Sequence, residues 1–349
     1  MVATYIIQFG YNFAVVGPVM FIPLVANSFG ASPAVVGLIV STYQAVIFLS
    51  SGVFGRLADI RGHKLFIVIG LLLAAGALFA HRYIIDVPSA FLVRAIAGLA
   101  VGIFPAAVVA YASRQTENLG RFTAVGSLGW GTGSVVAGAI AVYSRLYVLA
   151  AVIFLLCAVV ALISIPETRE RVNMPFFSTL VIRRNWRVYV SFFLRHAGAM
   201  GIWAIFPIYL ERLGASKLWI GIIYALNAFG QFACMPLLDR FKTRHLIQVG
   251  FVGSVVTFIS FALCRNFWQL LPFQLLLAVS WSCLYVGSLK YLFEHNEERS
   301  TAVGVFNSTL SLSGIVGALL GGALAGLGLP VVMIAAALMS VAGVLVFRF

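Results

Sequence analysis

Three side chains that can carry charge lie well inside long apolar segments of the sequence, away from the segment ends: Arg94, Arg195 and its neighbour His196. A guanidinium group binds carboxylates and phosphates through paired hydrogen bonds, and an imidazole changes its charge close to neutral pH. Holding a charge in hydrocarbon costs at least about 2.5 kcal/mol, so such positions need an explanation. The pattern indicates anion recognition or proton movement, with bonding to carbonyls of neighbouring helices as the structural alternative for Arg94.

Carboxylates are distributed differently from these cations. All ten Asp and Glu residues fall at the edges of the apolar segments or between them. A carboxylate inside a membrane can bind a proton and lose its charge before a cavity reorients, and this chain offers none in mid-segment. If protons are coupled to its activity, His196 is a candidate carrier, because its unperturbed pKa lies near neutrality.

The composition shows which solvent surrounds these groups. The chain has 349 residues, of which 62% are hydrophobic and only 9% charged, whereas a soluble domain needs roughly 25% charged residues. Its apolar segments run for about 20 residues without the alternation of barrel strands, as helices that cross a bilayer require. The sequence therefore predicts an all-α membrane protein.

Twelve membrane spans can be counted between charged or Gly/Pro-rich breaks. Basic residues resist translocation, so they mark the cytoplasmic side. With the N-terminus inside, sixteen Lys and Arg residues fall on the inner side and five on the outer side. We expect a multi-pass protein of the cytoplasmic membrane with both termini cytoplasmic. The predicted spans are 4–27, 33–55, 65–81, 87–112, 122–143, 146–165, 187–210, 217–237, 246–264, 267–292, 301–325 and 328–347.

The two halves of the chain repeat each other. At an offset of 184 residues, Pro23 pairs with Pro207 and GAS at 30–32 pairs with GAS at 214–216. At an offset of 178 residues, RFTAVG at 121–126 returns as RSTAVG at 299–304. Such parallel repeats are typical of transporters built from two similar bundles. We expect six-helix domains over 1–165 and 187–349, joined by a cytoplasmic linker over 166–186.

A charged loop follows the second span and reads GRLADIRGHK over residues 55–64. It resembles GxLADRxGRK, the loop signature of the major facilitator superfamily. The equivalent loop of the second half contains a degenerate copy, Asp239-Arg240-Phe-Lys242-Thr-Arg244. The resemblance implies twelve helices in two bundles with pseudo-twofold symmetry. We interpret the loop as a latch in which Asp59 pairs with neighbouring helices when the inner mouth is closed. The alternative, favoured for Lys64, is that these charges only fix the topology. The candidate latch residues are Gly55, Asp59, Arg61, Gly62, Lys64, Asp239 and Arg240.

Arg94 begins RAIAGLAVG, with Gly98 and Gly102 at four-residue intervals. This resembles the RxxxGxxxG pattern of the superfamily's drug/proton antiporters, whose arginine is associated with proton coupling. Span 5 is rich in glycine but lacks the Gly-Pro that ends the corresponding antiporter element. The sequence is thus closest in motifs to the multidrug efflux-like branch, with that departure.

The resemblance implies that spans 1, 4, 7 and 10 line a central cavity, flanked by spans 2, 5, 8 and 11. Polar and aromatic side chains in these spans are candidates for substrate binding or coupling, with hydrogen bonding between helices as the alternative. They are Arg94, Arg195, His196, Asn12, Tyr11, Gln44, Asn227, Gln231 and Trp281.

The predicted function is secondary transport of a small solute by alternating access. The first hypothesis is export of a small hydrophobic or amphipathic compound, with proton coupling as an additional hypothesis. An organic anion carrier that uses the two arginines and a facilitator without ion coupling are the alternatives. An enzyme is not expected, because the five histidines are scattered and no HExxH pattern or phosphate loop occurs. The expected partners are a small-molecule substrate, protons and the lipid bilayer, without nucleic acid, cofactor or metal, in a monomer.

Overall fold

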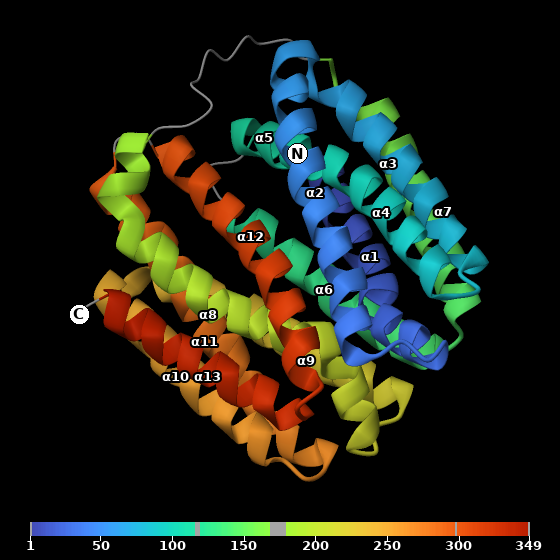
Figure 1. Ribbon diagram of the computed structural model, residues 1–349. Helices are drawn as coiled ribbons and strands as arrows, with labels where there is room; N and C mark the ends of the chain where they lie inside the picture. Colours follow the sequence, from blue (N-terminus) through green and yellow to red (C-terminus); the bar gives the residue numbers. More distant parts are fainter. Residues whose placement is uncertain (1, 116–118, 168–178, 297–298, 348–349) are drawn as a thin grey trace. The chain divides into compact units, whose positions relative to one another are not determined.

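The computed structural model describes residues 2–115, 119–167, 179–296 and 299–347, and all the regular elements in these ranges are helices (Figure 1). Within the described ranges, eleven helical segments are long and apolar enough to cross a membrane. The one predicted span outside these eleven is the fifth, 122–143, which corresponds to the 22-residue helix α6 (Leu119–Ile140). Large apolar side chains remain exposed along the helices, for example Leu156 at 60% and Leu338 at 65%, as expected of a surface that faces lipid.

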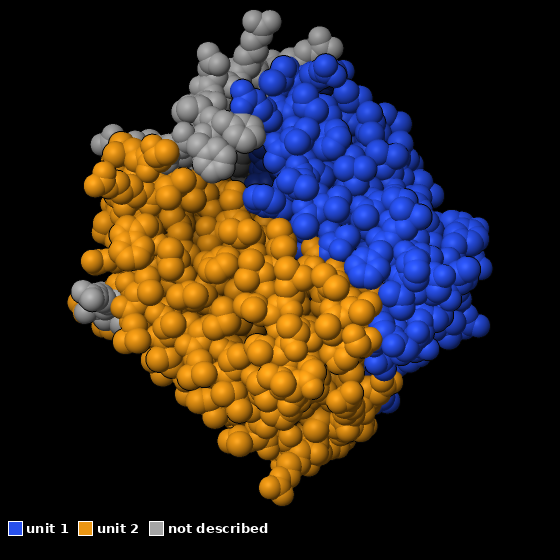
Figure 2. Space-filling view, in the orientation of Figure 1, with its two compact units in different colours: residues 1–31, 42–173, 216–232 blue, residues 32–41, 174–215, 233–349 orange. Residues whose placement is uncertain are grey.

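The chain divides into two compact units (Figure 2). Unit 1 comprises residues 1–31, 42–173 and 216–232. Its helices are α1 (Val2–Ser28), most of α2 (Pro33–Arg61), α3 (His63–Ala80), η1 (His81–Tyr83), α4 (Val87–Ile103), α5 (Pro105–Gln115), α6, α7 (Tyr143–Ser164) and the greater part of α9 (Lys217–Cys234).

Unit 2 comprises residues 32–41, 174–215 and 233–349. It contains the start of α2 and the end of α9, followed by elements from the second half of the chain. These are α8 (Thr179–Arg212), η2 (Met235–Arg240), α10 (Thr243–Leu263), η3 (Phe267–Gln269), α11 (Leu270–His295), α12 (Arg299–Ala325) and α13 (Leu329–Phe347).

Two boundaries differ from the sequence-based expectation. The fourth predicted span is broken at Phe104, because Pro105 has no N–H to donate and its ring disfavours a continuous helix. Residues 179–186, assigned to the linker, are instead the first turns of α8. Their arginines gave this segment the composition of a loop, although Val181 and Asn185 are buried on one face of the helix.

Helix α4 begins with a capping box at Asp86. The Asp86 carboxylate accepts a hydrogen bond from the backbone N–H of Ser89 at 2.8 Å, and the Ser89 hydroxyl faces the Asp86 N–H at 3.1 Å. These bonds to Ser89 hold the pKa of Asp86 below its usual value. The cap fixes where the helix that carries Arg94 starts.

Glycines bring helix backbones into contact inside each unit. In unit 1, a Cβ placed on Gly138 of α6 would lie 3.1 Å from the Cα of Gly221 in α9. In unit 2, a Cβ on Gly322 of α12 would lie 2.8 Å from the Cα of Gly37 in α2. Both pairs are related by the 184-residue offset of the repeat, so the duplicated sequence makes the same contact twice.

The contact in unit 1 carries an additional cap. Lys217 donates from Nζ to the carbonyl oxygen of Ala141 at 3.2 Å, and the same ammonium lies 4.3 Å from the centre of the Tyr143 ring. Ala141 has φ of 54°, a left-handed conformation that favours glycine. The lysine thus binds the carbonyl of a strained residue just after α6 ends.

Candidate functional site

The pattern of Arg94, Gly98 and Gly102 packs α4 directly on α2 in unit 1. A Cβ on Gly98 would lie 2.7 Å from the carbonyl oxygen of Tyr43, and one on Gly102 would lie 2.7 Å from Cβ of Ser50. The Ser50 hydroxyl donates to the Leu99 carbonyl at 2.7 Å. Only glycine allows the two backbones to approach this closely.

That approach sets the surroundings of Arg94. Its side chain is 1% exposed, and the guanidinium carbon lies 3.5 Å from the centre of the Tyr43 ring. Among the described residues, Arg94 Nε and Nη1 have no hydrogen-bond partner. A cation on an aromatic face in a desolvated site gains about 2 kcal/mol, so the ring supplies much of the stabilisation that a carboxylate would otherwise give.

Two further polar side chains complete what we call the Arg94 cluster, which consists of Tyr43, His81, Arg94 and Tyr147. His81 is 1% exposed, and its Nδ1 lies 2.9 Å from the Ala77 carbonyl, which assigns the proton of the neutral ring to Nδ1. The His81 ring centre lies 5.2 Å from that of Tyr147, and Arg94 interacts electrostatically with both. His81 Nε2 and the Tyr147 hydroxyl are buried without a hydrogen-bond partner among the described residues.

The other predicted site residues of unit 1 make mostly local contacts. The Asn12 side chain donates to the Gln8 carbonyl at 2.8 Å, and Gln231 Nε2 donates to Asn227 Oδ1 at 2.7 Å. The Tyr11 ring packs edge-on against Phe104 at 5.2 Å. Gln44 is half-buried on α2. These contacts lie within a helix or in the apolar core, so the structure does not bring these residues into the Arg94 cluster.

Arg195 is buried in unit 2 at the junction of three helices. It is 1% exposed on α8, and its Nε donates to the Ser254 hydroxyl of α10 at 2.8 Å. Its guanidinium carbon lies 5.3 Å from the ring centres of both Phe258 and Trp281. Nη2 is buried without a partner among the described residues.

The neighbour of Arg195 begins a stack of rings, here called the aromatic ladder: His196, Trp281 and Tyr285. His196 stacks on Trp281 with ring centres 4.9 Å apart and planes 29° apart, and Trp281 stacks on Tyr285 at 5.6 Å and 24°. Buried Phe192 meets Trp281 edge-on at 5.6 Å. All three rungs are half-buried, so each keeps part of its surface accessible on unit 2.

The predicted latch loop contains a conformation that only glycine adopts easily. Gly62 has φ of 103° between α2 and α3, and a Cβ on Gly55 would lie 3.3 Å from Cβ of Ala106. Arg61 is exposed and Lys64 half-buried. In the second copy, the Arg240 Nε donates to the Leu237 carbonyl at 3.1 Å. The side chains of Asp59 and Asp239 lie outside the described part of the structure, so their pairing stays a prediction.

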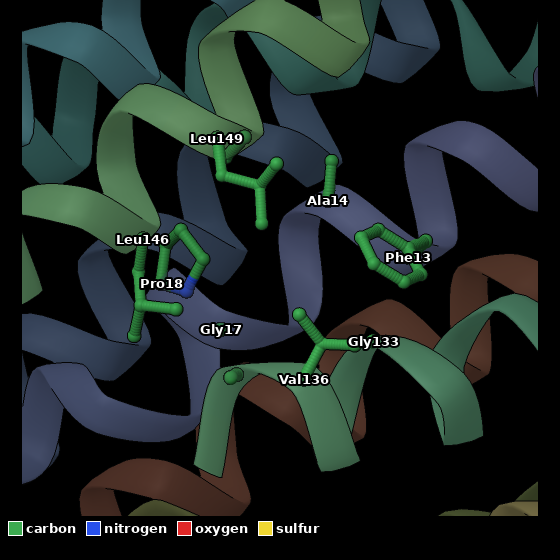
Figure 3. A pocket seen from close by; sticks show the side chains of 10 residues that line it. Phe13, Ala14, Gly17, Pro18, Gly133, Val136, Leu146 and Leu149 are labelled. Atoms are coloured by element: carbon green, nitrogen blue, oxygen red, sulfur yellow. The ribbon is translucent and has the colours of Figure 1, made fainter. Parts of the chain in front are cut away.

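A small crevice lies among α1, α6 and α7 of unit 1 (Figure 3). Its wall is apolar and includes Phe13, Pro18, Val136, Leu146 and Leu149. None of the predicted site residues lines it. Among the described residues, no group of three or more His, Cys, Asp and Glu side chains could hold a metal ion.

Comparison with known proteins relates the whole chain to transporters. The sequence profile of the Major Facilitator Superfamily matches residues 4–229 and 188–349. The quinolone resistance protein NorA of Staphylococcus aureus is 22% identical over 326 residues, which are 87% of this chain and 84% of NorA. The MFS-type transporter eupM of a Phoma species is 33% identical over 129 residues, so the match spans only 45% of eupM and 34% of this chain.

Two solved structures share the fold. The nucleoside transporter NupG aligns with a TM-score of 0.78 at 14% identity, over 99% of this chain and 97% of that chain. A bacterial homologue of the lysosomal transporter Spinster, in an inward-facing and occupied conformation, aligns with a TM-score of 0.75 at 15% identity, over 99% and 95% of the two chains. The all-helical fold predicted from the sequence is thereby confirmed.

Proposed function

The chain belongs to the Major Facilitator Superfamily and is a transporter. We propose that it exports small, flat, amphipathic compounds by alternating access, with proton coupling. Similarity to a quinolone resistance protein over 87% of the chain supports export of aromatic compounds. In this proposal residues 1–165 and 187–349 act as two bundles that rock about a shared site, and both termini are cytoplasmic.

The aromatic ladder is the observation that carries the substrate class. A planar aromatic compound can continue the stack of His196, Trp281 and Tyr285, because offset ring stacking gains about 0.5–1.5 kcal/mol beyond the area buried. The ladder is half-buried rather than packed out of reach. The guanidinium carbon of buried Arg195 lies 5.3 Å from the centre of the Trp281 ring and helps to fix the position of that ring.

The Arg94 cluster is the proposed coupling element. Arg94 is a fixed cation, and His81 beside it is buried with an Nε2 that has no hydrogen-bond partner among the described residues, so this nitrogen can accept a proton. A proton on His81 would place a second positive charge next to Arg94, so protonation favours a conformation in which the two side chains separate. Of the histidines inside apolar segments, both His81 and His196 can thus serve as carriers, and His81 was not anticipated from the sequence.

Transport in proteoliposomes tests this proposal. Vesicles that contain the purified chain should accumulate a fluorescent quinolone when a pH gradient is imposed, and collapse of the gradient should stop accumulation. Trp281→Leu should reduce uptake by up to about tenfold, since it removes the central rung of the stack, whereas Trp268→Leu, on exposed η3, should not. The proposal would be contradicted if vesicles without protein took up as much quinolone as vesicles that contain the chain. Equal uptake by the two tryptophan variants would also contradict it.

An organic anion carrier is the second candidate, supported by a different observation. Arg94 and Arg195 are both buried, two guanidinium nitrogens of Arg94 and one of Arg195 lack partners among the described residues, and the sequence has no carboxylate in mid-span. Such groups bind carboxylates. Uptake of a labelled dicarboxylate that Arg195→Ala abolishes, together with no quinolone uptake, would favour this function over export of neutral or cationic compounds.

A further inference from the structure

Helix α8 is longer than a membrane crossing requires. Its 34 residues rise about 51 Å at 1.5 Å per residue, whereas the hydrocarbon core is about 30 Å thick. The apolar part of the helix begins at Val188, so residues 179–187 extend beyond the hydrocarbon to the level of the lipid headgroups. This extension is independent of the transport proposal above.

One face of the extension is fixed to unit 2. Val181, Asn185 and Val188 are buried, and Asn185 exchanges side-chain hydrogen bonds with Asn296 at 2.8 and 3.1 Å. One turn later, the Tyr189 hydroxyl donates to the Ala302 carbonyl at 3.1 Å. The extension is therefore a rigid continuation of the helix and not a trailing segment.

The opposite face continues the lipid-facing stripe of α8. Leu180 and Val190 are 59% and 39% exposed, and the exposed Arg183 and Arg187 lie between them at helical spacing. The same face that meets acyl chains at Val190 thus presents two guanidinium groups one to two turns earlier. Trp186, 47% exposed, lies beside them, with its ring centre 5.8 Å from the Arg187 guanidinium carbon.

This arrangement suits one kind of ligand. Guanidinium groups bind phosphate oxygens in pairs, and tryptophan prefers the boundary between headgroups and acyl chains. Arg184 is left out of the site because its Nη1 donates to Asn296 Oδ1 at 3.4 Å. The carboxylate of Glu294 accepts a hydrogen bond from the Thr243 hydroxyl at 2.6 Å. We propose that Arg183, Trp186 and Arg187 form a binding site for the headgroup of an anionic phospholipid at the beginning of α8.

Lipid-dependent thermal unfolding tests the site. Purified full-length chain in a neutral detergent is titrated with dioctanoyl-phosphatidylglycerol, dioctanoyl-phosphatidylcholine or inorganic phosphate, and unfolding is followed by labelling of the buried cysteines Cys157 and Cys283. A ligand that binds the folded state raises the melting temperature. Phosphatidylglycerol should raise it at concentrations where the other two do not.

The variant R183Q/R187Q should need about thirtyfold more phosphatidylglycerol to reach half of the full rise in melting temperature. This factor corresponds to the loss of about 1 kcal/mol of binding free energy for each arginine. The matched control R212Q/R265Q removes two exposed arginines from the other end of unit 2 and should leave the titration unchanged. Equal titrations for R183Q/R187Q and the wild type would overturn the proposal, as would an equal rise with phosphatidylcholine or with inorganic phosphate.

A second measurement needs no substitution. Native mass spectrometry of the wild-type chain in an equimolar mixture of the two lipids should show phosphatidylglycerol retained in clear excess. Equal retention of the two lipids would overturn the proposal even if R183Q/R187Q failed to fold.

Discussion

The stack of Arg94 on Tyr43 predicts a coupling energy that can be measured. Both side chains are almost fully buried, at 1% and 4% exposure, and the guanidinium carbon lies 3.5 Å from the ring centre, so we expect the upper value of about 2 kcal/mol for the pair. Burial of the charge costs at least about 2.5 kcal/mol, which the ring nearly offsets. Arg94→Met should therefore change the free energy of unfolding by less than about 1 kcal/mol in the wild-type chain.

The same substitution should behave differently once the ring is gone. In a Tyr43→Leu background, Arg94→Met should raise the free energy of unfolding by about 2 kcal/mol, because it removes a charge that has lost its partner. A double-mutant cycle of equilibrium unfolding in mixed micelles measures the coupling free energy between Arg94 and Tyr43. Tyr209→Leu, in unit 2, is the control and should be additive with Arg94→Met within about 0.5 kcal/mol. A coupling below about 0.5 kcal/mol between residues 43 and 94 would refute the ring as the partner of the guanidinium.

Three other predictions concern Ala141, Asp59 and Asp86. Ala141→Gly should raise the free energy of unfolding by about 0.5–1 kcal/mol because it relieves a φ of 54°, while Ala137→Gly inside α6 should lower it by a similar amount; equal effects would contradict this. Asp59→Asn should increase labelling of cysteines introduced at the cytoplasmic mouth, and unchanged labelling would remove the latch hypothesis. Because hydrogen bonds from Ser89 lower the pKa of Asp86, the stability it contributes is present above the pKa of a free aspartate, about 3.9, and is lost as pH falls through the lowered value. Asp86→Asn should thus flatten the pH dependence of unfolding between pH 5 and 2, and a curve parallel to the wild type would exclude that contribution.

The long apolar segments predicted the helices well because a bilayer leaves few alternatives for apolar segments of about 20 residues. Pro105 is a sequence signal for the helix break at Phe104. The prediction missed the break because the span is continuously hydrophobic. The start of α8 was missed because Arg183, Arg184 and Arg187 suggest a loop. Only the buried spacing of Val181, Asn185 and Val188 reveals the helix, and burial is a property of the folded chain.

The candidate site was predictable in part. Arg94 and Arg195 stood out because charge is rare in apolar segments, and both are buried. The partners of the two arginines could not be assigned from the sequence. Tyr43 and Ser254 belong to other helices and reach the arginines only through tertiary packing. His81 and Tyr147 lie near the ends of their helices, where polar side chains are common and carry little signal. Trp281 was identified from its position within a span, but its stacking with His196 and Tyr285 required coordinates.

Transport by the Arg94→Ala variant is the most direct test of the central claim, that a buried cation in unit 1 couples substrate movement to the conformational cycle. Purified variant and wild type are reconstituted in parallel, and uptake of the fluorescent quinolone is measured under the same pH gradient, with the melting temperature in detergent as the check on folding. The account predicts a folded variant without gradient-driven uptake. Wild-type uptake by a folded Arg94→Ala protein would contradict it and leave Arg94 a structural role beside Tyr43.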